Sequence, residues 1–162
     1  MVSLQEEVRK NFQSGAALRC PPHITLHMPF KLRSRKLVGF KDHLHKLFSI
    51  HDEFPIKLKD FSAFEPRVIY IDVLPNESLR KLQRDLHDHL RHWNLSDSTY
   101  GDRGFVPHVT IAFRDLRRAK FKQAWSQYEH VQFKASCIVK EVCLLQHDGQ
   151  RWQIHHRFQL NF

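Results

Sequence analysis

Residues 22–26 read Pro-His-Ile-Thr-Leu, and residues 107–111 read Pro-His-Val-Thr-Ile. Each stretch is a His-x-Thr motif that follows a proline, with apolar residues between and after its two polar members. This alternation predicts a half-buried strand, because successive side chains of a strand point to opposite faces. The His and Thr of each motif therefore project from one face, and the apolar residues bury the other.

The order of elements around the first motif is repeated around the second, at a distance of about 85 residues. Helical spacing predicts helices over about 2–14, 36–50, 77–93 and 117–129. Strands are expected near 23–28, 54–60, 68–73, 107–113, 131–139, 141–147 and 152–160. Asp148-Gly149 predicts a tight hairpin turn between the last two strands, and the stretch 94–104, rich in Ser, Asp and Gly, predicts a loop.

The apolar stripes of these helices define the candidate core. In the first helix they are Val2, Leu4, Val8 and Phe12; in the second Leu37, Phe40, Leu44, Leu47 and Phe48; in the third Leu79, Leu82, Leu86 and Leu90. Repetition of so large a unit predicts one domain of two pseudo-symmetric lobes, about 1–66 and 67–162, whose motif strands face each other. The fold class is α+β with mainly antiparallel strands, because most connections between strands are too short for helical crossovers.

Two imidazoles and two hydroxyls in one groove suit phosphodiester chemistry without a metal. A neutral histidine removes a proton from the attacking water or hydroxyl, and a protonated one supplies a proton to the departing oxygen. The threonine hydroxyls donate hydrogen bonds to non-bridging phosphate oxygens. Which histidine is the acid stays open, because the roles exchange when the reaction is reversed.

The segments PPHITL (21–26) and PHVTIAF (107–113), and the order of elements over nearly the whole chain, resemble the 2H phosphoesterase superfamily. Within it they resemble the 2′-5′ RNA ligase-like, 2′,3′-cyclic phosphodiesterase branch. The resemblance implies a bilobal fold with a central cleft and outer helices, His23 and His108 as catalytic residues, and Thr25 and Thr110 as phosphate ligands. It also implies that no metal or organic cofactor is required. The family's usual first strand is absent before the first helix, so we expect an open sheet edge.

Other side chains near the motifs are candidate substrate contacts. His27 lies two residues beyond Thr25, and Arg114 lies at an even offset from His108, one position later than the basic residue often found in the family. Phe61 and Phe64, in the expected turn before Val68, can stack on a base. Each also has a structural interpretation: a partly exposed strand histidine, a solvated arginine, or aromatic core packing. The basic loop Arg33, Arg35 and Lys36 either guides an RNA strand or is simply solvated.

Composition limits the remaining possibilities. The 162 residues, 41% hydrophobic, suit one compact domain. An excess of 26 Lys and Arg over 17 Asp and Glu favours a polyanionic partner, such as RNA ends or a nucleotide, unless the charge only aids solubility. Cys20, Cys137 and Cys143 show no CxxC spacing and are expected to be buried free thiols. Histidines two apart on a helix, as in 43/45 and 87/89, face different directions, so no metal site is expected.

The sequence thus predicts a metal-independent phosphodiesterase acting on 2′,3′-cyclic or 2′-5′ phosphodiesters of RNA or nucleotides. The alternative is a nucleotide- or RNA-binding module with little or no turnover. No apolar run is long enough to span a membrane, and the N-terminus does not resemble a signal peptide. We therefore expect a cytoplasmic protein that is a monomer or a weak homodimer.

Overall fold

The computed structural model describes residues 1–95 and 104–162, so most of the predicted loop at 94–104 lies outside the described residues. The elements are, in chain order, α1 (Val2–Phe12), the 3-10 helices η1 (Ala16–Arg19) and η2 (Ser34–Lys36), α2 (Leu37–Phe48), β1 (Phe54–Phe64), β2 (Val68–Val73), α3 (Glu77–Arg91), β3 (His108–Ala112), α4 (Arg118–Tyr128), β4 (Lys134–Val139), β5 (Glu141–His147) and β6 (Trp152–Gln159).

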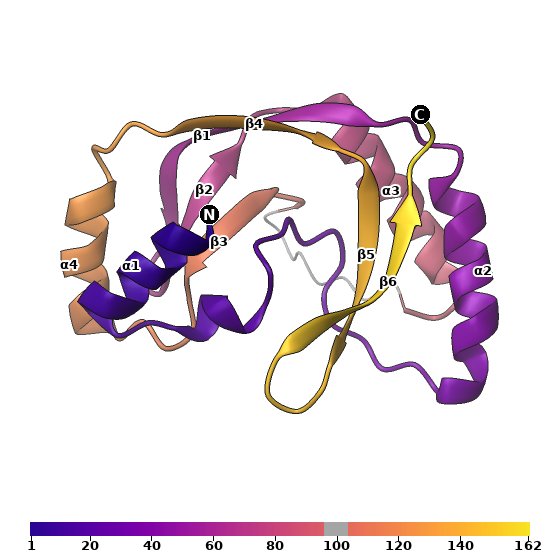
Figure 1. The fold of residues 1–162 in the computed structure, drawn as a ribbon, viewed down its shortest axis with the longest axis horizontal. Coiled ribbons are helices and arrows are strands. Elements are labelled where there is room, and N and C mark those ends of the chain that lie inside the picture. Colours follow the sequence, from indigo (N-terminus) through magenta and orange to yellow (C-terminus); the bar gives the residue numbers. More distant parts are fainter. Residues whose placement is uncertain (96–103) are drawn as a thin grey trace.

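The described strands form two antiparallel sheets. A four-stranded sheet has the order β3-β2-β1-β4, and β5 pairs with β6 in a hairpin. Figure 1 shows β4 running along the top of the molecule and leading into β5, so that the strands curl into a half-barrel. Helices α1 and α4 lie at one end, and α2 and α3 at the other (Figure 1). The predicted α+β class with antiparallel strands is confirmed; the boundary between the two pseudo-repeats stays a prediction.

Helix α3 shows the predicted relation between sequence and packing. Its N-cap Asn76 accepts a hydrogen bond from the Leu79 N–H at 2.8 Å, which satisfies one of the otherwise unpaired amides of the first turn. Its predicted stripe is buried in full: Leu79, Leu82, Leu86 and Leu90. In α2, the residues Phe40, Leu44 and Phe48 are buried, and Leu37 and Leu47 are half-buried.

Helix α1 departs from its predicted stripe at one position. Val8 and Phe12 are buried, but Val2 is 48% exposed and Gln5 is only 3% exposed. Helix α1 packs on β3, and the Gln5 side chain donates from Nε2 to the Thr110 carbonyl at 3.0 Å. The expectation for Val2 was wrong because the face of α1 that packs on β3 contains Gln5, whose burial is compensated by this hydrogen bond, and Val2 lies outside that face.

Strand β1 continues four residues beyond its predicted end at residue 60. Phe54, Ile56 and Leu58 are buried, and the alternation then shifts so that Phe61 is the next buried side chain. The register shifts between Lys59 and Phe61, with Asp60 at φ 52°, and the Asp60 carboxylate accepts the Phe133 N–H at 3.0 Å. A β-bulge at Asp60 therefore interrupts the alternation of buried and exposed residues, so the period-two pattern ends before the strand does.

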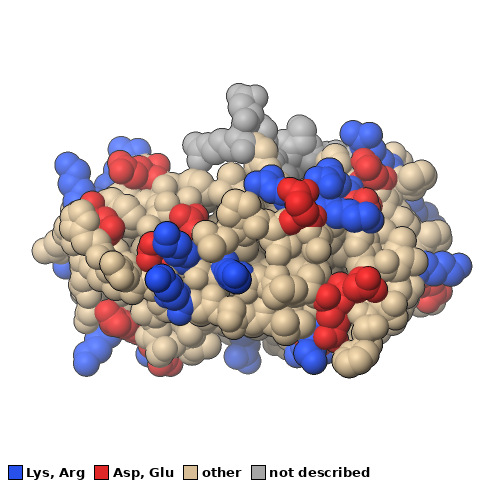
Figure 2. Space-filling view, turned by 90° about the horizontal axis from the view of Figure 1, so that it is seen from above, with Lys and Arg blue, Asp and Glu red and all other residues tan. Residues whose placement is uncertain are grey.

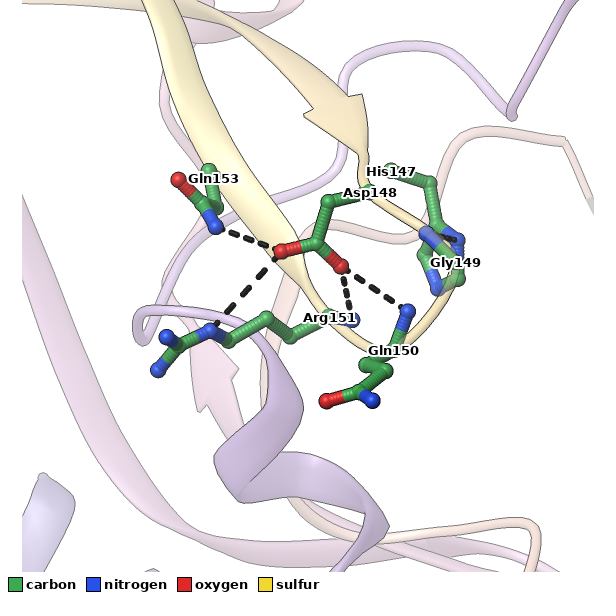
Figure 3. Close-up of polar contacts among 6 residues, drawn as sticks. All are labelled: His147, Asp148, Gly149, Gln150, Arg151 and Gln153. Atoms are coloured by element: carbon green, nitrogen blue, oxygen red, sulfur yellow. Dashed lines mark hydrogen bonds and ion pairs between the residues drawn. The ribbon is translucent and has the colours of Figure 1, made fainter.

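The hairpin between β5 and β6 is confirmed, but its loop is longer than two residues. His147 pairs with Trp152, so the loop is 148–151, and Gly149 adopts φ 102°. The Asp148 carboxylate accepts the backbone N–H groups of Gln150 and Arg151, both at 2.8 Å, as well as the Gln153 amide (Figure 3). The aspartate thus closes the turn with its own side chain.

The first motif does not form the regular strand predicted at 23–28. Within the described chain, its one bridge joins Ile24 to Val109 in antiparallel orientation. Pro21 and Pro22 have no N–H to donate to a ladder, and the Thr110 carbonyl is already bonded to Gln5. The chain also bends at Leu26 and His27, so pairing with β3 ends after one bridge.

Charge is distributed rather than gathered on the face over β1 and β4. Figure 2 shows Lys and Arg side chains interspersed with Asp and Glu across that face. All three cysteines are free, as predicted, but the expectation that they are buried was wrong, because Cys137 is exposed and the other two are half-buried. None of the helices in the described parts of the chain is long and apolar enough to cross a membrane.

Candidate functional site

The bridge between Ile24 and Val109 brings the two His-x-Thr motifs side by side. In this antiparallel register, His23 lies opposite Thr110, and Thr25 lies opposite His108. Directly opposed residues of an antiparallel pair point to the same face. All four polar side chains therefore lie on one face, opposite to the face on which Val109 is buried.

Both histidines are held through the same ring nitrogen. His23 Nδ1 lies 2.7 Å from the Pro21 carbonyl oxygen, and His108 Nδ1 lies 2.7 Å from the Val106 carbonyl oxygen. A carbonyl only accepts, so each Nδ1 must carry the proton in the neutral ring. Nε2 is then the nitrogen left to accept or deliver a proton in both residues.

The segment leading to His23 is tied to the residues that follow β3. The Asp115 carboxylate accepts from Ser14 Oγ at 2.7 Å, and from the N–H groups of Gly15 and Ala16 at 3.0 and 2.9 Å. Ser14 is fully buried. These bonds fix the start of η1, which leads into Cys20, whose Sγ lies 3.3 Å from His23 Nδ1. Burial raises the pKa of the Cys20 thiol to about 11, so the group stays protonated at neutral pH.

Aromatic rings surround His108 on the side of β1 and β2. Its ring lies 4.8 Å from that of Tyr70 and 5.2 Å from that of Phe64, which meets it edge to face. Phe64 and Tyr70 are themselves 4.4 Å apart. Tyr70 is buried, whereas Phe64 is half-buried, so Phe64 is the aromatic side chain nearer to solvent beside His108.

Two polar side chains complete the surroundings of His108. Asp72 is its cross-strand partner on β2, and the Ser62 hydroxyl on β1 favours the ionised form of the Asp72 carboxylate. Burial lowers the pKa of His108, and nearby His23 lowers it further, while the Val106 carbonyl and Asp72 act in the opposite direction. Burial likewise raises the pKa of Asp72, against the effects of Ser62 and His108.

The other three predicted substrate contacts, Phe61, Arg114 and His27, differ in their surroundings. Phe61 is buried on the opposite face of the sheet, against Tyr128 at 5.0 Å and Phe133 at 5.6 Å, so it packs in the core. Arg114 follows the end of β3 at Ala112 and adopts φ 65°. The strand alternation that was used to put its side chain on the same face as His108 therefore does not apply to it. His27 lies at the bend, with Nδ1 bonded to the Met28 carbonyl and its ring against Phe30.

Sequence reasoning missed the residues that support the motifs: Gln5, Ser62, Tyr70, Asp72 and Asp115. Asp72 was detectable as the one acidic residue within the apolar run of β2. The others carry no local signal, because their partners are distant in sequence. No group of three or more His, Cys, Asp or Glu side chains in residues 1–95 and 104–162 is arranged to hold a metal ion.

Comparison with known proteins identifies the family of the chain. The model of the 2′-5′ RNA ligase superfamily matches residues 3–151. A Geobacillus sp. (strain WCH70) protein named "Putative phosphoesterase" is 34% identical over 154 residues, covering 93% of this chain and 84% of the relative. A relative of the same name from Geobacillus kaustophilus is 32% identical over 154 residues, with the same coverage. The chain belongs to the 2′-5′ RNA ligase superfamily, a family of 2H phosphoesterases.

Solved structures show the same fold at lower identity. TT0787 of Thermus thermophilus has a TM-score of 0.67 and 20% identity, covering 98% of this chain and 88% of that one. E. coli LigT complexed with 3′-AMP has a TM-score of 0.64 and 19% identity, covering 99% and 92%. The 2H phosphoesterase fold expected from the resemblance is thereby confirmed.

Proposed function

We propose that this protein is a metal-independent phosphodiesterase acting on 2′,3′-cyclic or 2′-5′ phosphodiesters of nucleotides and RNA. The observation that carries the proposal is the shared face of the two His-x-Thr motifs, with both Nδ1 atoms bonded to carbonyls and both Nε2 atoms left for proton transfer. Membership of a phosphoesterase family supports it independently.

For a cyclic phosphate, the reaction requires one neutral and one protonated histidine. Nε2 of the neutral ring takes a proton from water while the water oxygen bonds to phosphorus. The phosphorus–oxygen bond to one ribose oxygen breaks, and Nε2–H of the other histidine protonates that oxygen. Thr25 and Thr110 donate hydrogen bonds to the non-bridging oxygens, where charge develops. Either histidine can take either part.

The class of substrate is supported by the relatives and by charge. LigT has been crystallised with 3′-AMP, with NADP+ and with ATP, which are all nucleotides. The net charge of +9 favours a phosphate-bearing ligand. In this proposal Phe64, which is half-buried beside His108, contacts a base or sugar attached to the reacting phosphate.

The experiment is incubation with nucleoside 2′,3′-cyclic phosphates in EDTA, with chromatographic separation of the 2′- and 3′-monophosphates. We expect turnover to either the 2′- or the 3′-monophosphate alone, because the bound cyclic ester presents only one of its two ribose oxygens to the protonated histidine. Binding without turnover of any cyclic or 2′-5′ substrate would favour the alternative of a binding module.

Substrate length can be tested in the same assay. If RNA is the substrate, an oligonucleotide ending in a cyclic phosphate binds more tightly than a mononucleotide, and the advantage falls steeply between about 50 and 200 mM salt. Arg33→Ala with Arg35→Ala should then weaken only the oligonucleotide, since both side chains are exposed in the segment before α2. Equal binding of both lengths would indicate a small nucleotide.

A further inference from the structure

We propose that Asp72, held by Ser62, is a positioning residue that stabilises the protonated form of His108. The inference rests on the proposed function for its consequence, but the effect of Asp72 on His108 can be measured without turnover. It concerns a carboxylate outside both His-x-Thr motifs.

The register of the sheet places Asp72 beside His108. The two are Cα partners across β2 and β3, and Thr25 lies opposite His108 on its other side. Opposed residues of an antiparallel pair have Cβ atoms about 4.5–5.5 Å apart on one face. His108 is thus flanked by a hydroxyl and a carboxylate, with its Nδ1 bonded to the Val106 carbonyl.

Asp72 is unusual for its strand. Its neighbours Ile69, Tyr70, Ile71 and Val73 are buried, and Asp72 itself is half-buried. Partial burial of a carboxylate is costly unless hydrogen bonds or opposite charge compensate. The Ser62 hydroxyl supplies a hydrogen bond, and His108 is the neighbouring histidine whose positive charge favours the ionised carboxylate. The same interaction favours the positive charge on His108.

Other titratable groups around the pair do not replace Asp72. His23, from the first motif, opposes a second positive charge next to His108. Tyr70 packs its ring on His108, and burial raises its pKa, so it stays neutral. On β1, Lys59 lies opposite Asp72 and is 3.9 Å from the Asp60 carboxylate, while Asp60 opposes the negative charge of Asp72. Among the described carboxylates, Asp72 is therefore the one whose negative charge favours protonation of His108.

Stabilising the protonated imidazole of His108 favours catalysis whether His108 is the acid or the base. If His108 is the acid, it must start protonated; if it is the base, it gains a proton in the transition state. With Nδ1–H fixed to a carbonyl, the additional proton is on Nε2, where proton transfer takes place. Asp72 does not need to touch the substrate for this effect.

The test is an NMR titration of the His108 imidazole, assigned by its loss in His108→Ala, in the wild type and in Asp72→Asn. We expect His108 to titrate about one pH unit lower in Asp72→Asn, the lower end of the effect of a neighbouring opposite charge. The limb of the kcat/KM profile that reports His108 should move with it, and kcat/KM should fall about tenfold. Asp88→Asn is the matched control, because Asp88 is 69% exposed and pairs only with Arg91 among the described residues; it should change neither.

Ser62→Ala provides a second, milder variant and should shift the titration in the same direction by less. An unchanged His108 titration in folded Asp72→Asn overturns the inference, and so does an unchanged titration in Ser62→Ala if Asp72→Asn fails to fold. If the titration shifts but the wild type turns over no phosphodiester, Asp72 acts on His108 and the proposed function is wrong.

Discussion

Replacing Asp115 should uncouple the segment that carries His23 from the strand that carries His108. The carboxylate accepts three hydrogen bonds from residues about 100 positions earlier in the chain. Asp115→Ala leaves the fully buried Ser14 hydroxyl and two backbone N–H groups without this acceptor. A hydrogen bond to a charged group contributes about 1.5–3 kcal/mol, but these three share one exposed carboxylate, so we expect a total of about 2–4 kcal/mol.

The assay is thermal unfolding together with kcat/KM on a cyclic phosphate. At about 2–4 °C for each kcal/mol in a domain of this size, Tm should fall by about 4–16 °C. Below the transition, kcat/KM should also fall, because η1 leads directly to His23. Asp115→Asn keeps one acceptor oxygen and should cost about half as much. Asp88→Ala removes an exposed aspartate from α3 and serves as the control.

Ser14→Ala distinguishes loss of the hydrogen bonds to Asp115 from a general effect of its charge. It should destabilise the wild type, yet cost little in the Asp115→Ala background, because the two groups bond to each other. An Asp115→Ala protein that unfolds at the wild-type temperature, or additive losses in the double variant, would refute the reasoning.

Three further predictions concern individual contacts. Thr25→Ala or Thr110→Ala should each lower kcat/KM by about 100-fold without changing the shape of its pH profile, since hydroxyls do not titrate; a displaced limb would contradict this role. Phe64→Leu should lower kcat/KM with little change in Tm. Phe61→Leu should instead lower stability by about 1–2 kcal/mol and leave kcat/KM unchanged. The reverse result would mean that Phe61 contacts substrate and Phe64 only packs. Backbone N–H groups of the hairpin hold the pKa of Asp148 at about 2, below its unfolded value, so the stabilisation from its charge is present at neutral pH and is lost as pH falls through about 2. The Tm difference between wild type and Asp148→Ala should therefore narrow as pH falls from about 5 to about 2, and a constant difference would show that charge is not involved.

The sequence predicted the elements whose pattern is local. The stripe of α3 and the run of β2 are read correctly, because one face of each packs on the core and selects apolar residues at a fixed period. The antiparallel class followed from short connections between strands, and the candidate site was proposed from a motif that occurs twice. These signals need only neighbouring residues.

The sequence could not predict features that depend on distant partners. The bulge at Asp60 is fixed by the Phe133 N–H, so the end of β1 was placed too early. The first motif was expected as a strand, but the Gln5 amide already occupies the Thr110 carbonyl. Arg114 was linked to His108 by alternation, which ends with the strand at Ala112. Asp72 lies beside His108, and Ser62 lies beside Tyr70, only because of the pairing register of β1, β2 and β3.

The most direct test of the central claim is turnover of a nucleoside 2′,3′-cyclic phosphate in EDTA by the wild type, His23→Ala, His108→Ala and the double variant. We predict that the wild type is active and that each single variant loses at least about 100-fold in kcat. The double variant should lose little more, because the two histidines act as a unit. His27→Ala, in which a nearby histidine bonded to the Met28 carbonyl is removed, should stay active. Activity abolished by EDTA, or alanine variants of His23 and His108 that keep the wild-type rate, would contradict the two-histidine site.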